Sequence, residues 1–182
     1  MNQFVVVLTG LPGSGKTTAS DYFRKQHLSV VSMGEITRML LQEKKLLQTE
    51  ENEKAIRTNL RKNHGEDIYA RLIMKDVRKM LRKHQLVAIE GLRSEKELDY
   101  FKKKLTDVKL IFINADRRIR YLRLQKRQFR PLDYHQAKQR DIWEKSQGVL
   151  RLRRSADWNI ENQSTKSEFY AKLNQVIKAA PI

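Results

Sequence analysis

The sequence contains no cysteine among its 182 residues. This absence excludes disulfides, thiolate metal sites and thiol catalysis, and it fits a protein of a reducing compartment. No apolar run approaches the roughly 20 residues that cross a bilayer, and the first apolar run already begins at residue 4, which leaves no room for a signal peptide. We therefore expect a cytoplasmic protein that makes no use of a membrane.

Acidic residues are scarce relative to basic ones, because 21 Asp and Glu stand against 38 Lys and Arg, for a net charge of +17. Such an excess indicates an anionic partner, and nucleotides, acidic substrates and RNA all qualify. Proline and glycine are also few, at 3 and 7 residues, and no linker or internal repeat divides the chain. With 40% apolar residues, the whole of 1–182 is expected to form one domain.

Three of the few glycines lie in one segment, residues 10–17, which reads GLPGSGKT and fits the phosphate-loop pattern G-x-x-x-x-G-K-[ST]. Glycine lets the backbone curl so that N–H groups point at phosphates, and the following helix adds its positive N-terminal end. Lys16 is expected to contact the β- and γ-phosphates of ATP, and Thr17 to bind Mg²⁺. The predicted nucleotide-binding residues of this segment are Gly10, Gly13, Ser14, Gly15, Lys16, Thr17 and Thr18.

The surroundings of this loop predict an α/β fold. A β-branched run at residues 4–8 precedes it, and helix-forming residues 17–26 follow it. Further apolar runs alternate with helical patterns, which indicates a parallel sheet with right-handed crossovers. These four predicted strands are residues 28–33, 86–89, 108–113 and 156–160. Glu90 follows the third strand, where a carboxylate can complete a magnesium site, and the alternative is that it merely begins a loop.

The basic residues are concentrated between residues 114 and 155, where 13 Lys and Arg face 4 Asp and Glu. Pro131 breaks the helical pattern inside this segment, and Asp133 with Gln136 can cap the helix that follows. One interpretation of the segment is a solvated helix face, and the other is a basic lid that hinges at the break.

Several segments together resemble the adenylate-kinase-like nucleoside monophosphate kinases. The resemblance is greatest to the archaeal-type adenylate-kinase-related branch, which is also similar to dephospho-CoA kinase. Besides the phosphate loop, the segments that carry it are MGEITR at 33–38, LRKNHG at 60–65, EGLRS at 90–94, residues 127–141, and AD at 156–157 followed by IEN at 160–162.

The resemblance implies a three-layer P-loop NTPase fold with a five-stranded parallel sheet, a helical acceptor-binding insert at about 34–80 and a short basic lid at about 127–140. It implies that Arg38 holds the acceptor phosphate, and that Arg61 and Arg93 assist it. Arg123 and Arg127 correspond to arginines that pack on the adenine or reach the γ-phosphate, and Arg140 to a second lid arginine. Asn162 belongs to the loop that cups the adenine.

Phosphoryl transfer needs two phosphates held in line and their charge neutralised, and arginine forks suit that task. We therefore predict a magnesium-dependent ATP phosphotransferase whose catalytic residues are Lys16, Arg127 and Arg140. The acceptor stays open between a nucleoside monophosphate and a dephospho-CoA-like compound. An RNA- or ribosome-associated ATPase that uses the basic surface is the alternative, although the sequence has no recognisable RNA-binding motif.

Overall fold

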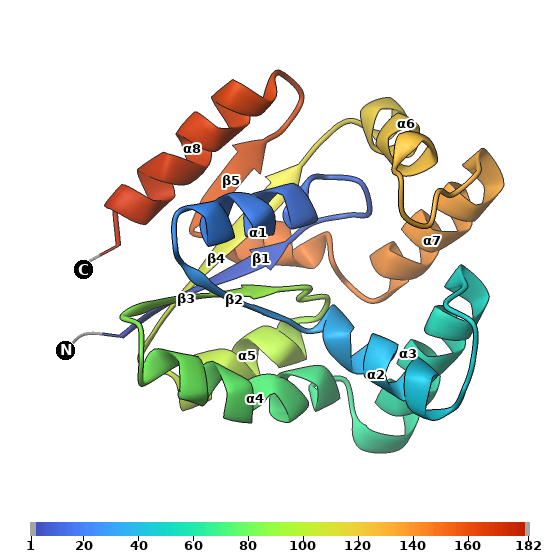
Figure 1. Cartoon of the computed structure of the whole chain (residues 1–182), viewed down its shortest axis with the longest axis horizontal. Helices are drawn as coiled ribbons and strands as arrows, with labels where there is room; N and C mark the ends of the chain where they lie inside the picture. The colour runs from blue at the N-terminus through green and yellow to red at the C-terminus, as the bar shows by residue number, and fades with distance from the viewer. Residues whose placement is uncertain (1–2, 181–182) are drawn as a thin grey trace.

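The computed structural model describes residues 3–180 and consists of a parallel sheet with helices on both faces (Figure 1). The five strands run in the spatial order β2-β3-β1-β4-β5, and every neighbouring pair is parallel. Their bounds are β1 Phe4–Thr9, β2 Ser29–Ser32, β3 Leu86–Glu90, β4 Asp107–Asn114 and β5 Trp158–Glu161. The predicted α/β class and the five-stranded parallel sheet are therefore confirmed.

Eight α-helices and one short 3₁₀-helix lie between and after the strands within residues 3–180. The helices are α1 Lys16–Lys25, α2 Gly34–Glu43, α3 Glu50–His64, α4 Ile68–Leu81, α5 Glu95–Lys104, α6 Arg117–Lys126, α7 Tyr134–Ser146 and α8 Lys166–Lys178, with the 3₁₀-helix η1 at Arg151–Ser155. None of the helices described by the structure is long and apolar enough to cross a membrane.

The central strand β1 is buried along its whole length, as its β-branched run predicts. Its register pairs Leu8 with Glu90 of β3 on one side and with Ile111 of β4 on the other. The carboxyl ends of these strands therefore meet at one edge of the sheet. This register brings the phosphate loop, which follows β1, next to Glu90.

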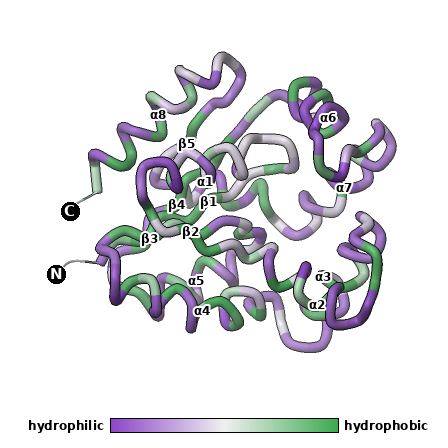
Figure 2. Tube along the Cα trace, viewed as in Figure 1, coloured by the Kyte–Doolittle hydropathy of each residue, from purple (hydrophilic) through white to green (hydrophobic). Residues whose placement is uncertain are grey.

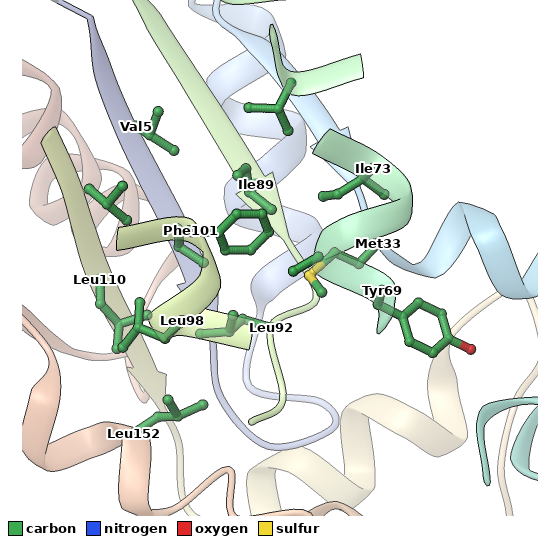
Figure 3. Packing of buried hydrophobic residues seen from close by; sticks show 14 of the residues in the cluster. Val5, Met33, Tyr69, Ile73, Ile89, Leu92, Leu98, Phe101, Leu110 and Leu152 are labelled. Carbon is green, nitrogen blue, oxygen red and sulfur yellow. The ribbon is translucent and has the colours of Figure 1, made fainter. Parts of the chain in front are cut away.

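Each face of the sheet is covered by its own hydrophobic core. On one face, α4 and α5 pack against β1, β3 and β4 (Figure 3), and the apolar residues of the strands lie inside while polar residues lie on the outer helices (Figure 2). On the other face, α1 and α8 insert Phe23 and Phe169 against Val6 and Ile111. The two cores fix the sheet edge on which the site is built.

The segment expected to form the acceptor-binding insert divides into two parts. Helix α4 packs into the core through Ile73, Val77 and Leu81, so it belongs to the helical layer on one face of the sheet. The helices α2 and α3 project beyond the sheet and face α7 (Figure 1). Asp133 caps α7 with the predicted reciprocal bonds to Gln136.

Candidate active site

The phosphate loop lies between the end of β1 and the start of α1, and the backbone at its three glycines, Gly10, Gly13 and Gly15, has no room for a side chain. Gly13 has φ +77°, and a Cβ there would lie 2.4 Å from the carbonyl oxygen of Arg120. Gly15 has φ +110°, and its Cβ would lie 2.2 Å from Nδ2 of Asn162. Both the left-handed backbone and the close neighbours therefore require glycine. The loop opens at the N-terminus of α1, where backbone N–H groups bind anions.

Lys16 is folded back over the loop. Its Nζ donates to the carbonyl oxygens of Gly10 at 2.5 Å and Leu11 at 3.1 Å. Burial lowers the pKa of Lys16 to about 8, and the Glu144 carboxylate opposes part of this effect. The ammonium group is therefore poorly compensated here, which favours contact with an anion.

Thr17 near the start of α1 and Glu90 at the end of β3 place their side-chain oxygen atoms side by side at the carboxyl edge of the sheet. The Thr17 hydroxyl donates to Oε1 of Glu90 at 3.1 Å. No group of three or more His, Cys, Asp or Glu residues in the described chain could hold a metal ion. A hydroxyl and one carboxylate nevertheless fit Mg²⁺, which usually takes one or two protein oxygens together with phosphates and water. When bound, the ion would neutralise charge on the phosphates.

A cavity of about 800 Å³ opens at this edge, between the phosphate loop, α2, α3 and the segment that joins α6 to α7. Eleven Lys and Arg residues line it, against only three carboxylates. The basic residues are Lys16, Arg24, Arg38, Arg57, Arg93, Arg123, Lys126, Arg127, Arg130, Arg140 and Lys166. An excess of eight positive charges around one open cavity indicates a ligand with several negative charges.

Most residues predicted for the site line this cavity. They are Gly13, Gly15, Lys16, Thr17, Thr18, Arg38, Glu90, Arg93, Arg123, Arg127 and Arg140. Gly10, Ser14, Asn162 and Arg61 do not line it. Asn162 supports the loop from behind, because its Nδ2 donates to the carbonyl oxygen of Ser14 at 2.8 Å. Gly10 holds Lys16 through its own carbonyl group.

Arg61 lies elsewhere than the expected position at the acceptor. It is buried, donates to Oε1 of Glu97 at 2.7 Å and lies over the ring of Tyr69 at 4.6 Å. Glu97 in turn accepts the backbone N–H of Arg93 at 2.7 Å. Tyr69 lies at the edge of the hydrophobic core, and its hydroxyl points away from the core (Figure 3). The hydroxyl oxygen lies 2.8 Å from the Thr37 hydroxyl. Arg61 therefore joins α3 to the segment that carries Arg93.

The comparisons with known proteins agree with this architecture. The model of the AAA domain family matches residues 6–148. A UPF0200 protein of Pyrococcus furiosus is 31% identical over 177 residues, which cover 95% of each chain. The chain belongs to the UPF0200 family. A UPF0200/UPF0201 protein of Archaeoglobus fulgidus is also 31% identical, over 95% of this chain, and the chain spans about half of that relative's length, 54%.

Two solved structures share the fold. The protein TT1252 from Thermus thermophilus superposes with a TM-score of 0.71 at 16% identity, and all of both chains is covered. Shikimate kinase from Bacteroides thetaiotaomicron superposes with a TM-score of 0.57 at 13% identity over 97% of each chain. At these identities the likeness concerns the fold alone.

Among the charged cavity residues that sequence reasoning missed, three are buried, namely Glu53, Arg57 and Glu144. Burial lowers the pKa of Arg57 to about 10, and its guanidinium lies 5.0 Å from the ring of Trp143. Glu144 is 2% exposed. Burial acts to raise its pKa, but Arg93 and Arg140 outweigh it and hold the pKa at about 2. Nothing in the sequence distinguishes these residues from the charges on helix surfaces.

The segment between α6 and α7, together with the first half of α7, reaches across the cavity to α3. Arg130 pairs with Glu53, and Arg140 donates to Glu50 at 2.6 Å. Glu50 also accepts Arg57 at 2.7 Å. Arg130 and Arg140 are therefore held by carboxylates of α3 at the cavity. This interface explains why α2 and α3 face α7.

Several arginine nitrogens around the cavity are buried and have no hydrogen-bond partner among residues 3–180. They belong to Arg57 Nε, Arg123 Nη1, Arg127 Nη2, Arg130 Nε and Arg140 Nε. A buried donor without a partner is costly, and a charged one more so. Phosphate oxygens would satisfy these donors with charge-assisted hydrogen bonds.

The lowered pKa of Lys16 gives a testable pH dependence. Without nucleotide the side chain loses its charge as pH rises through about 8, whereas phosphate contact favours the charged form. We expect ATP affinity to fall by up to about tenfold per pH unit above that value, and ATP binding there to take up protons. Calorimetry in buffers of different ionisation enthalpy measures both. The Lys16→Arg variant keeps its charge and should show a flat profile, so identical profiles would contradict the assignment.

Proposed function

We propose that the protein is a magnesium-dependent phosphotransferase of the nucleoside monophosphate kinase type. It transfers the γ-phosphoryl group of ATP to a small, nucleotide-like acceptor that carries a phosphate. The observation that carries this proposal is the set of buried, unpartnered arginine donors around a cavity of about 800 Å³ beside the phosphate loop. A switch ATPase would need donors for one nucleotide, whereas this cavity extends from the loop to α2 and α3.

The donor half of the cavity lies at the phosphate loop. Lys16 and the backbone N–H groups at the start of α1 would hold the β- and γ-phosphates, while Thr17 and Glu90 would hold Mg²⁺. Arg123 lies on α6 beside Asn162, to which it donates at 3.4 Å. This position supports a role for Arg123 on the nucleotide side. Asn162 would act through Arg123 and the loop backbone.

The acceptor half lies between α2, α3 and the segment after β3. Arg38 is half exposed and pairs with Glu35, and Arg93 donates to both carboxylate oxygens of Glu144 at 3.0 Å. Arg57 completes this half from α3. Three arginines from three elements can surround one phosphate group, which supports a phosphorylated acceptor.

The way in which the cavity's carboxylates are paired indicates which type of atom accepts the phosphoryl group. An alcohol would have to lose a proton to a base, whereas a phosphate oxygen is already anionic. Glu144 is held by Arg93 with a pKa of about 2, and Glu53 accepts Arg57 at 2.8 Å. Glu90 is the remaining carboxylate, and it belongs to the proposed magnesium site. No His or Asp lines the cavity within residues 3–180. These pairings favour a phosphate oxygen as the acceptor atom.

In the proposed reaction an acceptor phosphate oxygen forms a bond to the γ-phosphorus while the bond to the β,γ-bridging oxygen breaks and ADP leaves. Lys16, Arg127 and Arg140 would follow the charge as it shifts between the two phosphates. The arginine-rich segment over the cavity would also exclude water and so limit hydrolysis.

The proposal is tested by measuring ADP formation with a panel of acceptors. The panel contains the four ribonucleoside and four deoxyribonucleoside monophosphates, each paired with its nucleoside, together with dephospho-CoA. We expect a phosphorylated acceptor to raise ADP formation well above the ATP hydrolysis seen without acceptor, and phosphorus NMR to show a new phosphoanhydride. Transfer to a nucleoside or to dephospho-CoA would contradict the phosphate-oxygen assignment. ATP hydrolysis that no acceptor changes would contradict phosphotransfer.

Replacement of Arg38 should separate acceptor binding from ATP binding. We expect Arg38→Ala to raise the acceptor KM by about tenfold or more with ATP affinity nearly unchanged, because the residue lines the half of the cavity away from the loop. Arg38→Lys should restore little, since a point charge cannot replace the guanidinium fork. Glu35→Gln is the matched control, because Glu35 pairs with Arg38 but does not line the cavity. An equal loss of ATP affinity would place Arg38 on the donor side.

A further inference from the structure

A second concentration of positive charge lies far along the chain from the lid, on the outer side of α4 and α5. We call it the α4–α5 basic face. It comprises ten exposed residues: Arg71, Lys75, Arg78, Lys79, Arg82, Lys83, Lys96, Lys102, Lys103 and Lys104. The exposed carboxylates on the same two helices are Asp76, Glu95 and Asp99, which leaves an excess of seven positive charges.

The charges on α4 follow the geometry of the helix. Arg71, Lys75, Arg78 and Arg82 are spaced by four, three and four residues, which places them in one row along the helix. The row presents one cation per turn, about every 5.4 Å. Helix α5 packs beside α4 on the same face of the sheet (Figure 1), so its lysines extend the row into a broader surface.

These cations have few partners. Arg71 pairs with Asp67 at 3.3 Å, and no ion pair joins any of the other nine within residues 3–180. The basic group on η1 differs, because Arg151 pairs with Glu95 at 3.3 Å and Arg153 with Glu161 at 3.5 Å. Unpaired like charges repel one another, so a bound polyanion would stabilise the α4–α5 basic face.

The active site does not account for this face. None of its ten residues lines the cavity. The proposed ATP and acceptor sites therefore do not use the charge of this face, and another anion has to be considered.

We propose that the α4–α5 basic face binds the phosphate backbone of a nucleic acid, independently of base sequence. A regular row of cations suits a polymer with regularly spaced phosphates. No Phe, Tyr or Trp on α4 or α5 is exposed, so base stacking is absent and phosphate contacts carry the affinity. This proposal does not depend on the proposed phosphotransfer.

A membrane surface fits the face less well than a nucleic acid. Amphipathic helices bind anionic lipids by inserting an apolar side between the headgroups. The apolar side of α4 is buried in the core, where Ile73 and Val77 are 1% and 0% exposed. Leu72, at 44% exposed, is the single large apolar residue that α4 presents to solvent. The helix therefore has charge for a lipid surface but little to insert into it.

The test compares two triple variants of the full chain that each remove three charges. One is Lys75→Gln, Arg78→Gln and Arg82→Gln on α4, and the other is Arg151→Gln, Arg153→Gln and Arg154→Gln on η1. Fluorescence anisotropy follows the binding of an RNA duplex, a DNA duplex and single-stranded RNA at salt concentrations from about 50 to 200 mM. Thermal melts and ATP turnover show that both variants remain folded and active.

We expect the wild-type chain to bind with strong salt dependence. The α4 variant should bind at least about tenfold more weakly, with a slope of log K against log salt that is smaller by about 2 to 3 units, because each lost phosphate contact removes about 0.9. The η1 variant should resemble the wild type. Equal losses in both variants, or no wild-type binding at the lowest salt, would overturn the proposal. Binding to phosphatidylserine vesicles without binding to nucleic acid would overturn it as well.

Discussion

Lys16→Ala is expected to lower phosphoryl transfer from ATP by about 10²- to 10³-fold, the effect of removing one preorganised charge contact from a transition state. Among the described residues Lys16 donates only to the carbonyl oxygens of Gly10 and Leu11, and its burial leaves the charge poorly compensated. The side chain therefore contributes little to holding the loop together. Its role is to meet the phosphates that the loop encloses.

The fold of the variant should survive, which a thermal melt can verify. Loss of Lys16 removes a buried charge that is costly to hold, and Glu144 remains paired with Arg93 and near Arg140. Single-turnover transfer from radiolabelled ATP measures the chemical step without interference from product release. Lys25→Ala on the exposed end of α1 is the matched control, and it should behave as the wild type. Turnover of Lys16→Ala at the wild-type rate would remove the assignment of the phosphate loop.

The sequence was sufficient for the sheet and the loop because both depend on local patterns. Five apolar runs bounded by turns became five parallel strands, and the bounds differ from the prediction by two residues at most. The glycine spacing at residues 10–17 also fixed the position of Lys16 and Thr17 at the start of α1. Glu90 could be placed from the rule that the strands of a parallel sheet end at the same edge.

The positions of the buried charged residues could not be predicted in this way. Arg61 and Arg57 lie on the same helix, one turn apart, and both are buried. Only the tertiary structure shows that Arg57 faces the cavity while Arg61 faces Glu97 and Tyr69. The burial of Glu144 could not be predicted either, because it depends on how α7 packs over Arg93. Long-range pairs of charges leave no periodic signal along a chain.

The resemblance to nucleoside monophosphate kinases predicts Arg140 as a lid arginine, and the structure shows which carboxylates hold Arg140 and the nearby Arg130. Arg140 is shared between Glu50 at 2.6 Å and Glu144 at 3.8 Å, and Arg130 pairs with Glu53. Phosphates entering the cavity would compete with these carboxylates for the same guanidinium groups. Arg130 and Arg140 therefore line the cavity and are held by carboxylates that a phosphate group could replace.

Arg127→Ala and Arg140→Ala should each lower kcat by about 10²-fold, the size expected for one transition-state charge contact. Within residues 3–180 the buried Nη2 of Arg127 has no hydrogen-bond partner, and neither has Nε of Arg140, whose contact with Glu144 at 3.8 Å is too long for a hydrogen bond. Both groups are thus free to donate to a phosphate as charge moves from donor to acceptor. Steady-state kinetics with the acceptor identified from the panel measures kcat and both KM values.

The fold should tolerate these two substitutions, because the carboxylates left behind retain other arginines. Glu50 still accepts Arg57 at 2.7 Å, and Glu144 still accepts Arg93 at 3.0 Å. Arg151→Ala and Arg153→Ala are the matched controls, since both residues pair with carboxylates on the surface and neither lines the cavity. Their kcat should stay within about twofold of wild type, as expected for surface ion pairs worth under 1 kcal/mol. If all four variants lose activity equally, general electrostatics explains the effect, and the lid arginines have no specific role in transfer.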